Sequence, residues 1–280
     1  MSPQLARAAR YVADHPEQVA VGSLRALART LGVSPATMTR LARTLGHASY
    51  DALRRESAAA LARQGGYAHR AQRLQDAAKP PANPLAALSQ AQVAAVQSVP
   101  AVNSERQIES FCRALLRARR VGFLGLRSSH AIAFQFSYVY GFLFDNGVLL
   151  GDAAGALLDD AGRLTARDAL VAITVAPYTR ASLECVCSAA DRGVPILAIT
   201  DSSASPLGRY AKHALTVDTE SPSFFSTMAG LLACVETLVL RLALQQGERA
   251  VERLAAIDER LRRAGAYEDT GWRRNLKVSA

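Results

Sequence analysis

Short apolar runs alternate with helix-forming segments through the second half of the chain. Runs of strand length cover residues 121–126, 148–150, 169–175, 195–200 and 214–218. Segments with helical patterning follow at residues 130–144, 154–162, 180–192, 206–211 and 224–246. Buried strands that alternate with helices are typical of a mostly parallel sheet with helices on both faces. We therefore expect an α/β domain with a mostly parallel five-stranded sheet.

The positive charge of the chain is concentrated at its N-terminus. Residues 1–79 hold 12 Lys and Arg against 5 Asp and Glu, whereas the remainder holds 21 against 19. A small basic domain joined to a nearly neutral one predicts a polyanionic partner for the N-terminal part. A basic surface without a partner is the alternative.

The basic part contains the pattern of a helix-turn-helix. Ser23 precedes a helix at residues 24–31, Gly32 takes the turn, and Ser34-Pro35 begins the next helix with a capping hydroxyl and a proline in the first turn. A further helix continues to Gln64, where two glycines end it. Apolar side chains at helical spacing are expected to face inward, and these are Val33, Met38, Leu41 and Leu45. The pattern predicts an all-α helix-turn-helix domain; a plain helical hairpin is the alternative.

The outer face of the second helix carries hydroxyls and arginines. Such a helix enters the major groove of double-stranded DNA with its N-terminal residues near the base edges. We predict that Thr37 and Arg40 contact base edges. Ser34, Thr39 and Arg43 are predicted to contact phosphates.

A proline-rich segment divides the chain. Three prolines lie within residues 80–84, where they oppose helix formation. Helices are expected on its C-terminal side at residues 85–98 and 104–119, the latter with Ile108, Leu115 and Leu116 facing inward. We predict a DNA-binding domain at 1–78, a linker with a connecting helix at 79–104, a sensor domain at 105–264 and a flexible tail at 265–280.

Hydroxyl and arginine side chains follow the predicted strands. Because ligands of parallel sheets gather at the carboxyl ends of the strands, these side chains suit a phosphate or a carboxylate. The predicted ligand-binding residues are Arg127, Ser128, Ser129, Thr174, Thr179, Arg180, Ser202 and Ser221. Ordinary helix capping is the alternative for any one of these loops. No Gly-x-Gly-x-x-Gly motif is present, so we expect no dinucleotide and no other cofactor.

Taken together, these segments resemble the RpiR/MurR-type bacterial transcriptional regulators. The resemblance rests on residues 33–50 (VSPATMTRLARTLGHASY), Gly125-Leu-Arg-Ser-Ser, Ile199-Thr-Asp-Ser and Glu220-Ser-Pro-Ser-Phe-Phe. It implies a helix-turn-helix joined to a sugar isomerase (SIS) domain that senses a ligand, often a phosphosugar. It also implies a homodimer or homotetramer that binds a palindromic DNA operator.

Two loops depart from the pattern of SIS domains. Their first loop is commonly Gly-x-Gly-x-Ser, and here Arg127 stands at the second glycine position. Their second loop commonly resembles Ser-x-Ser-Gly-x-Thr, and here Ala176 and Pro177 replace a hydroxyl and the glycine. Arg127 and Arg180 are candidates to supply the missing anion-binding capacity. The effector is therefore a phosphosugar or a metabolite that carries a carboxylate.

A ligand-responsive DNA-binding regulator is the leading functional hypothesis. A sugar-phosphate isomerase is the second; it needs a general base, for which His130, His213 and Glu220 are the candidates. The sequence pattern does not complete a catalytic site around these residues, so we predict no catalytic residue; we also predict no metal site. A metabolite-binding adaptor for protein or RNA is the third hypothesis. The four cysteines are expected to be buried thiols in the cytoplasm, and no membrane association is expected.

Overall fold

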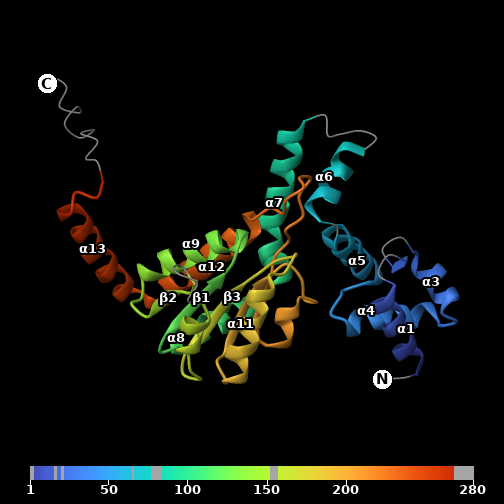
Figure 1. The fold of residues 1–280 in the computed structure, drawn as a ribbon, viewed down its shortest axis with the longest axis horizontal. Helices are drawn as coiled ribbons and strands as arrows, with labels where there is room; N and C mark the ends of the chain where they lie inside the picture. Colours follow the sequence, from blue (N-terminus) through green and yellow to red (C-terminus); the bar gives the residue numbers. More distant parts are fainter. Residues whose placement is uncertain are drawn as a thin grey trace.

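The computed structural model describes residues 3–15, 18–19, 22–64, 66–76, 83–151 and 157–267. The N-terminal part is helical, and Figure 1 shows α1, α3 and α4 as a lobe from which α5 and α6 lead toward the rest of the chain. These helices are α1 (Pro3–Asp14), α3 (Leu24–Thr30), α4 (Pro35–Thr44), α5 (Tyr50–Gln64) and α6 (Tyr67–Asp76). The predicted helix-turn-helix corresponds to α3 and α4.

The helix-turn-helix is stabilised by caps at its helix starts and by a hydrophobic core beneath its helices. Ser34 Oγ accepts a hydrogen bond from the backbone N–H of Thr37 at 3.1 Å, and Pro35 occupies the first turn of α4. Gly32 lies between the helices with φ +60°, a backbone conformation that favours glycine. The core beneath includes Leu27, Ala28, Met38, Leu41, Tyr50 and Leu53.

Two side chains of α4 do not lie where the sequence predicts. Thr37 is only 5% exposed, because residues 37, 38, 41 and 42 form the side of α4 that packs on α1, α3 and α5. Its hydroxyl lies 2.9 Å from that of Ser34. Leu45 is 41% exposed, because the chain turns away at Gly46, where φ is +88°. The expectations of an outward Thr37 and an inward Leu45 are therefore wrong.

Two helices connect the lobe to the sheet. They are α7 (Pro84–Val102), which Asn83 caps through its side chain, and α8 (Glu105–Arg117), which begins with a capping box of Ser104 and Gln107. Ile108 and Leu115 are buried as expected, but Leu116 is 37% exposed, so the expectation that it faces inward is wrong. Part of the predicted proline linker lies outside the described residues, and the predicted domain boundaries stay predictions.

The C-terminal part contains the predicted five-stranded sheet, and every strand pair is parallel. Its strands are β1 (Val121–Gly125), β2 (Gly147–Leu149), β3 (Ala169–Ile173), β4 (Ile196–Thr200) and β5 (Ala211–Thr216), in the order β2-β1-β3-β4-β5. β1, β3 and β4 are buried along their whole length, as strands covered on both faces must be. The α/β fold class is confirmed.

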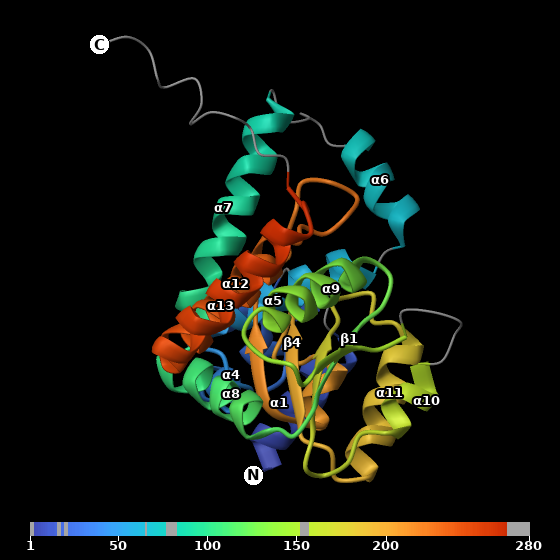
Figure 2. The same cartoon turned by 90° about the vertical axis from the view of Figure 1, so that its left-hand side faces the viewer.

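Helices cover both faces of this sheet (Figure 2). They are α9 (Ser128–Gly141), α10 (Leu157–Gly162), α11 (Arg180–Asp191), the 3₁₀ helix η1 (Pro206–Arg209), α12 (Ala229–Gln246) and α13 (Glu248–Arg263). Side chains of α7, α8, α9 and α12 share one core with the sheet, whereas α10 and α11 share another. In the first core, Phe123 packs on Phe136 and Tyr140, with ring centroids 4.9 and 5.2 Å apart.

The start of α12 differs from the prediction. α12 begins at Ala229 rather than at residue 224, because residues 219–228 form a loop in which Thr227 N–H donates to the carbonyl oxygen of Thr219 at 3.1 Å. By length and hydropathy, α12 is the one described helix that could cross a membrane, but its buried side chains belong to the core of the sheet. Most of the predicted flexible tail, residues 268–280, lies outside the described residues.

Candidate functional site

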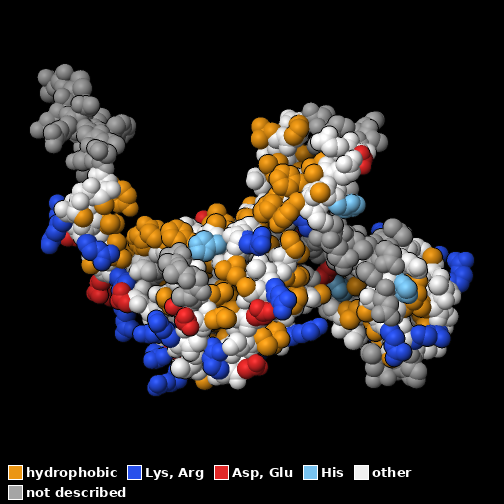
Figure 3. Space-filling view, in the orientation of Figure 1, with side chains coloured by type: hydrophobic (Ala, Val, Ile, Leu, Met, Phe, Trp, Pro, Cys, Tyr) orange, Lys and Arg blue, Asp and Glu red, His pale blue; other side chains and the backbone are white. Residues whose placement is uncertain are grey.

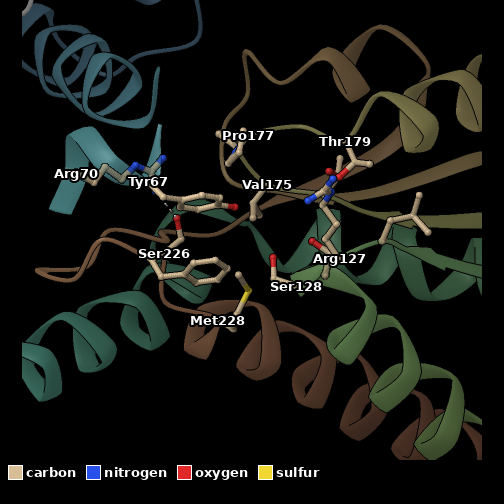
Figure 4. Close-up of a pocket in the computed structure, with 14 residues that line it drawn as sticks. Tyr67, Arg70, Arg127, Ser128, Val175, Pro177, Thr179, Ser226 and Met228 are labelled. Carbon is tan, nitrogen blue, oxygen red and sulfur yellow. Dashed lines mark hydrogen bonds between the residues drawn. The ribbon is translucent and has the colours of Figure 1, made fainter. Parts of the chain in front are cut away.

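The carboxyl ends of β1 and β3 border a recess that is open to solvent (Figure 4). The strand order reverses between these two strands, which is where ligands bind to open parallel sheets. Four segments form its walls: the loops after β1 and β3, the loop before α12, and α6. The lining residues are Tyr67, Arg70, Leu126, Arg127, Ser128, Ser129, Thr174, Val175, Ala176, Pro177, Thr179, Phe225, Ser226 and Met228.

The first loop brings a strained arginine to the N-terminus of α9. Arg127 has φ 55° and ψ −126°, which side-chain-bearing residues rarely adopt and glycine adopts readily. A conformation of this kind costs on the order of 1–3 kcal/mol and is concentrated at functional sites. Two residues earlier, a side chain on Gly125 would collide with the carbonyl oxygen of Ser129 and lie 2.8 Å from Ala133 Cβ. The backbone therefore turns tightly, and the exposed guanidinium stands at the positive end of a helix dipole.

The second loop is held by an acidic side chain from the neighbouring strand end. Asp201 accepts hydrogen bonds from the backbone N–H of Ala176 at 3.2 Å and from the hydroxyl of Tyr178 at 2.9 Å. The hydroxyl of Thr200 donates to the carbonyl oxygen of Thr174 at 2.8 Å. These bonds fix the loop, so that Thr174 and Thr179 line the recess.

The remaining wall joins two distant parts of the chain. The rings of Tyr67 in α6 and Phe225 are stacked, with centroids 5.5 Å apart and an interplanar angle of 13°. Nearby, Arg70 Nη1 lies 3.5 Å from Ser226 Oγ. These four residues are not among the predicted ligand-binding residues. Phe225 belongs to the quoted Glu220-Ser-Pro-Ser-Phe-Phe segment, but α6 offers few apolar residues and no motif that would mark it.

The electrostatics of the recess favour an anion. Arg70 and Arg127 are cationic, and none of the described residues that line the recess is acidic. Hydroxyls of Ser128, Ser129 and Thr179 are potential hydrogen-bond donors, and α9 directs its N-terminus to the same place. The arrangement can bind a phosphate or carboxylate through several hydrogen bonds.

The structure brings together five of the eight predicted ligand-binding residues: Arg127, Ser128, Ser129, Thr174 and Thr179. The other three do not line this recess. Arg180 has a 91% exposed side chain, which pairs with Glu184 one helical turn later at 2.7 Å. Ser202 is buried and donates to Glu56 of α5, whereas Ser221 accepts the backbone N–H of Ser223 at 3.1 Å. Local pairing accounts for Arg180 and turn formation for Ser221, whereas Ser202 bonds to a helix of the N-terminal part.

The candidate bases of an isomerase lie elsewhere. His130 is half-buried in the first turn of α9, Glu220 is exposed after β5, and none of the three candidates lines the recess. His213 lies on β5, where burial and the nearby Lys212 and Arg113 lower its pKa.

The candidate DNA-contacting surface is a stripe on α4. Ala36, Arg40 and Arg43 are exposed, Thr39 is half-buried, and their spacing places all four on one side of the helix. Ser34 is exposed at the helix start. Figure 3 shows Lys and Arg side chains along the outer edge of this lobe. Of the five predicted DNA contacts, the buried Thr37 alone lies off this surface.

Comparison with known families matches both parts of the chain. Residues 3–64 match the helix-turn-helix domain of the rpiR family, and residues 114–244 match the SIS domain. Comparison with curated proteins finds no match.

Solved structures share the fold. The sugar isomerase domain of an RpiR transcription factor from Sphaerobacter thermophilus is 27% identical, with 61% of this chain and 96% of that chain covered and a TM-score of 0.59. The Vibrio vulnificus NanR protein, complexed with ManNAc-6P, is 20% identical over 93% of each chain, with a TM-score of 0.60. A candidate sugar-phosphate isomerase from Listeria monocytogenes is 17% identical over 61% of this chain and 92% of that chain, with a TM-score of 0.54.

A helix-turn-helix domain joined to a SIS domain defines a class of ligand-sensing, DNA-binding transcriptional regulators. This chain belongs to that class as a member of the RpiR family. The predicted resemblance is therefore confirmed.

Proposed function

We propose that this protein regulates transcription by binding an operator through α4 and sensing an anionic metabolite in the recess beside β1 and β3. One observation carries the proposal: a basic, exposed stripe on the second helix of the helix-turn-helix occurs in the same chain as a cationic recess on a SIS domain. Arg40 is assigned to the base edges, and Ser34, Thr39 and Arg43 are assigned to phosphates.

A sugar phosphate is the first effector class to test. The N-terminus of α9 and the hydroxyls of Ser128, Ser129 and Thr179 offer the many donors that a phosphate requires. NanR, which shares the fold, is complexed with ManNAc-6P. A carboxylate-bearing metabolite is the second class, because Arg127 replaces a glycine and Pro177 cannot donate a backbone N–H.

We propose that the protein is not an enzyme. Aldose–ketose isomerisation needs a base near the reacting carbon, and none of His130, His213 and Glu220 lines the recess. The isomerase hypothesis is kept as a second candidate because the fold resembles a candidate sugar-phosphate isomerase. Turnover of a sugar phosphate that is lost in Glu220→Gln would support it and would contradict our assignment.

We also propose that the regulator is a homodimer or homotetramer in the cytoplasm, so that two copies of α4 read two half-sites. Large apolar side chains are exposed on three helices, α9, α12 and α13: Phe134, Tyr138, Leu240, Leu244 and Val251. Hydrophobic side chains are visible over these helices in Figure 3. Burial of such a surface between protomers is the favoured explanation.

The test is binding to DNA from the region upstream of the protein's own gene. We expect a gel shift at low salt, a steep loss of affinity as salt rises, and at least about tenfold weaker binding by Arg40→Ala. Arg249→Ala, an exposed arginine on α13, is the charge-matched control and should bind like the wild type. Binding that is absent, or equal in Arg40→Ala and the control, would contradict the proposal.

A further inference from the structure

One glutamate of the N-terminal part contacts both the SIS domain and the segment that follows α4. Glu56, on α5, accepts a hydrogen bond from the hydroxyl of Ser202, two residues after β4. Its other carboxylate oxygen lies 3.1 Å from Nδ1 of His47. Ser202 is only 8% exposed, and the side chain of His47 is 11% exposed. The two oxygens of one carboxylate therefore join two distant parts of the chain at a site that is largely shielded from water.

His47 is fixed to the end of α4. Its backbone N–H donates to the carbonyl oxygen of Ala42 at 2.8 Å, and the N–H of Gly46 donates to that of Arg43 at 3.0 Å. With Gly46 at φ +88°, these two bonds form a Schellman motif, a common C-terminal cap of helices. His47 and the last turn of α4, which carries the exposed Arg43, therefore move together.

Ser202 follows a residue that holds one wall of the recess. Asp201 accepts hydrogen bonds from the backbone N–H of Ala176 and from the hydroxyl of Tyr178, both in the loop after β3. Ala176 itself lines the recess. The Ser202 hydroxyl also accepts the backbone N–H of Ala204 at 3.1 Å, which fixes its position. The place of the Ser202 hydroxyl therefore depends on the conformation of the loop after β3.

We infer that Glu56 is a positioning residue: through Ser202 and His47 it makes the orientation of α4 depend on the loop that forms one wall of the recess. The inference rests on the proposed function, because it assigns the means by which the recess regulates DNA binding. It applies to any ligand that displaces this loop. The path of contacts runs from the loop after β3 through Asp201, Ser202, Glu56 and His47 to the end of α4.

The competing explanation is that Glu56 only holds α5 against the SIS domain. A hydrogen bond to a partly shielded carboxylate is strong enough for that role. The two explanations differ in one respect. If Glu56 only holds α5, a change in the recess loop affects α4 equally with and without Glu56. If Glu56 connects the loop to α4, the effect disappears when Glu56 is removed. A double-mutant cycle measures this difference.

Fluorescence anisotropy of the full chain on its upstream DNA, without ligand, is the test. Tyr178→Phe removes the hydroxyl that donates to Asp201 and so weakens the attachment of the recess loop. We expect this substitution to change the Kd at least about threefold in the wild type and less than about 1.5-fold in Glu56→Ala. Asp51→Ala removes an exposed carboxylate from the same helix and is the matched control, in which Tyr178→Phe keeps its effect. Glu56→Gln, whose amide oxygen still accepts a hydrogen bond from Ser202, should retain most of the effect.

Hydrogen exchange of residues 41–50, measured by mass spectrometry without DNA, repeats the cycle independently. Tyr178→Phe should speed exchange there at least about twofold in the wild type and leave it unchanged in Glu56→Ala. Ser202→Ala should also speed exchange, whereas Ser203→Ala, on the exposed neighbouring serine, should not.

Two results would overturn the inference: an equal effect of Tyr178→Phe with and without Glu56, or no effect of Tyr178→Phe on either DNA affinity or exchange. Either result, together with a wild-type protein that binds its upstream DNA, would reject the role of Glu56 and leave the regulator assignment standing. If the wild type does not bind this DNA but exchange depends on Glu56 as expected, the regulator assignment is rejected and the role of Glu56 is supported.

Discussion

The ring of Tyr67 stacks on the ring of Phe225, 5.5 Å away between centroids, and so joins α6 to the loop that leads into α12. A second link lies nearby, where Glu56 of α5 accepts a hydrogen bond from Ser202 at the end of β4. Glu56 also pairs with His47, just beyond α4, at 3.1 Å. Both links connect the sensor domain to helices that follow the DNA-contacting helix, which gives ligand binding a short structural route to DNA binding.

Loss of the Tyr67 ring should uncouple ligand binding in the recess from DNA binding by α4. A ligand changes DNA affinity only if it binds one arrangement of the chain more tightly than another, and the stacked pair contributes to that difference. We expect Tyr67→Ala to bind the upstream DNA but to respond to a sugar phosphate such as ManNAc-6P at least about fivefold less than the wild type, measured by fluorescence anisotropy. Tyr267→Ala, on a 70% exposed tyrosine, is the control and should respond normally. If the ligand changes the DNA affinity of Tyr67→Ala as much as that of the wild type, the Tyr67–Phe225 stack does not contribute to the coupling.

The strained backbone of Arg127 predicts an ordering of two variants. Glycine adopts φ 55° without strain, whereas alanine keeps the Cβ that causes it. Arg127→Gly should therefore be more stable than Arg127→Ala by about 1 kcal/mol in urea unfolding, although both lose the guanidinium and bind sugar phosphates more weakly. An alanine variant as stable as the glycine variant would show that the conformation carries no strain.

Neighbouring threonines of α4 should behave differently. Thr37→Val removes a buried hydroxyl that lies 2.9 Å from Ser34 Oγ, so it should lower the free energy of unfolding by about 1 kcal/mol. Thr39→Val, on the outer stripe, should leave stability nearly unchanged and weaken DNA binding. Thermal unfolding and anisotropy titrations of both variants measure these effects. If Thr37→Val is as stable as the wild type but binds DNA more weakly, Thr37 contacts DNA and our assignment of it to the core is contradicted.

The buried Asp168 predicts an acid dependence of stability. Burial raises the pKa of its carboxyl, but hydrogen bonds from Arg119 and Thr165 lower it more, so that the pKa falls from 3.8 to about 2. A lowered pKa contributes stability that is present above the unfolded-state value and is lost as pH falls toward 2. Asp168→Asn should cost about 2 kcal/mol at pH 7.

The difference between wild type and Asp168→Asn should shrink between pH 4 and pH 2. Urea unfolding across that range is the measurement. A difference that stays constant with pH would show that packing, and not the paired charge, accounts for the loss.

The patterns of apolar residues were sufficient to predict the sheet and the helix-turn-helix. Residues such as Val171 and Ile199 lie in short apolar runs that only buried strands explain, and Ser34-Pro35 marks the start of α4 without ambiguity. Gly125 and Arg127 likewise lay in a recognisable loop. These features depend on local chemistry, which the sequence displays directly.

The missed features depend on contacts between distant segments. Arg70 and Ser226 are 156 positions apart, and nothing near Arg70 in the sequence indicates that α6 reaches the recess. Arg180 was selected because it follows a strand, but Glu184 one turn later holds its side chain away from the recess. An inward set that includes Leu45 leaves Thr37 on the outer face of α4, but Leu45 is exposed and Thr37 faces the core.

Coupling between the recess and α4 is most directly tested by the affinity of the protein for its upstream DNA, measured by anisotropy without and with saturating ManNAc-6P or glucose 6-phosphate. We expect at least one ligand to change the Kd about fivefold or more, the usual range for linked sites. Arg127→Ala should abolish the change and keep the DNA affinity of the unliganded wild type. A Kd that stays constant while calorimetry shows the recess filled would contradict the coupling of the two sites.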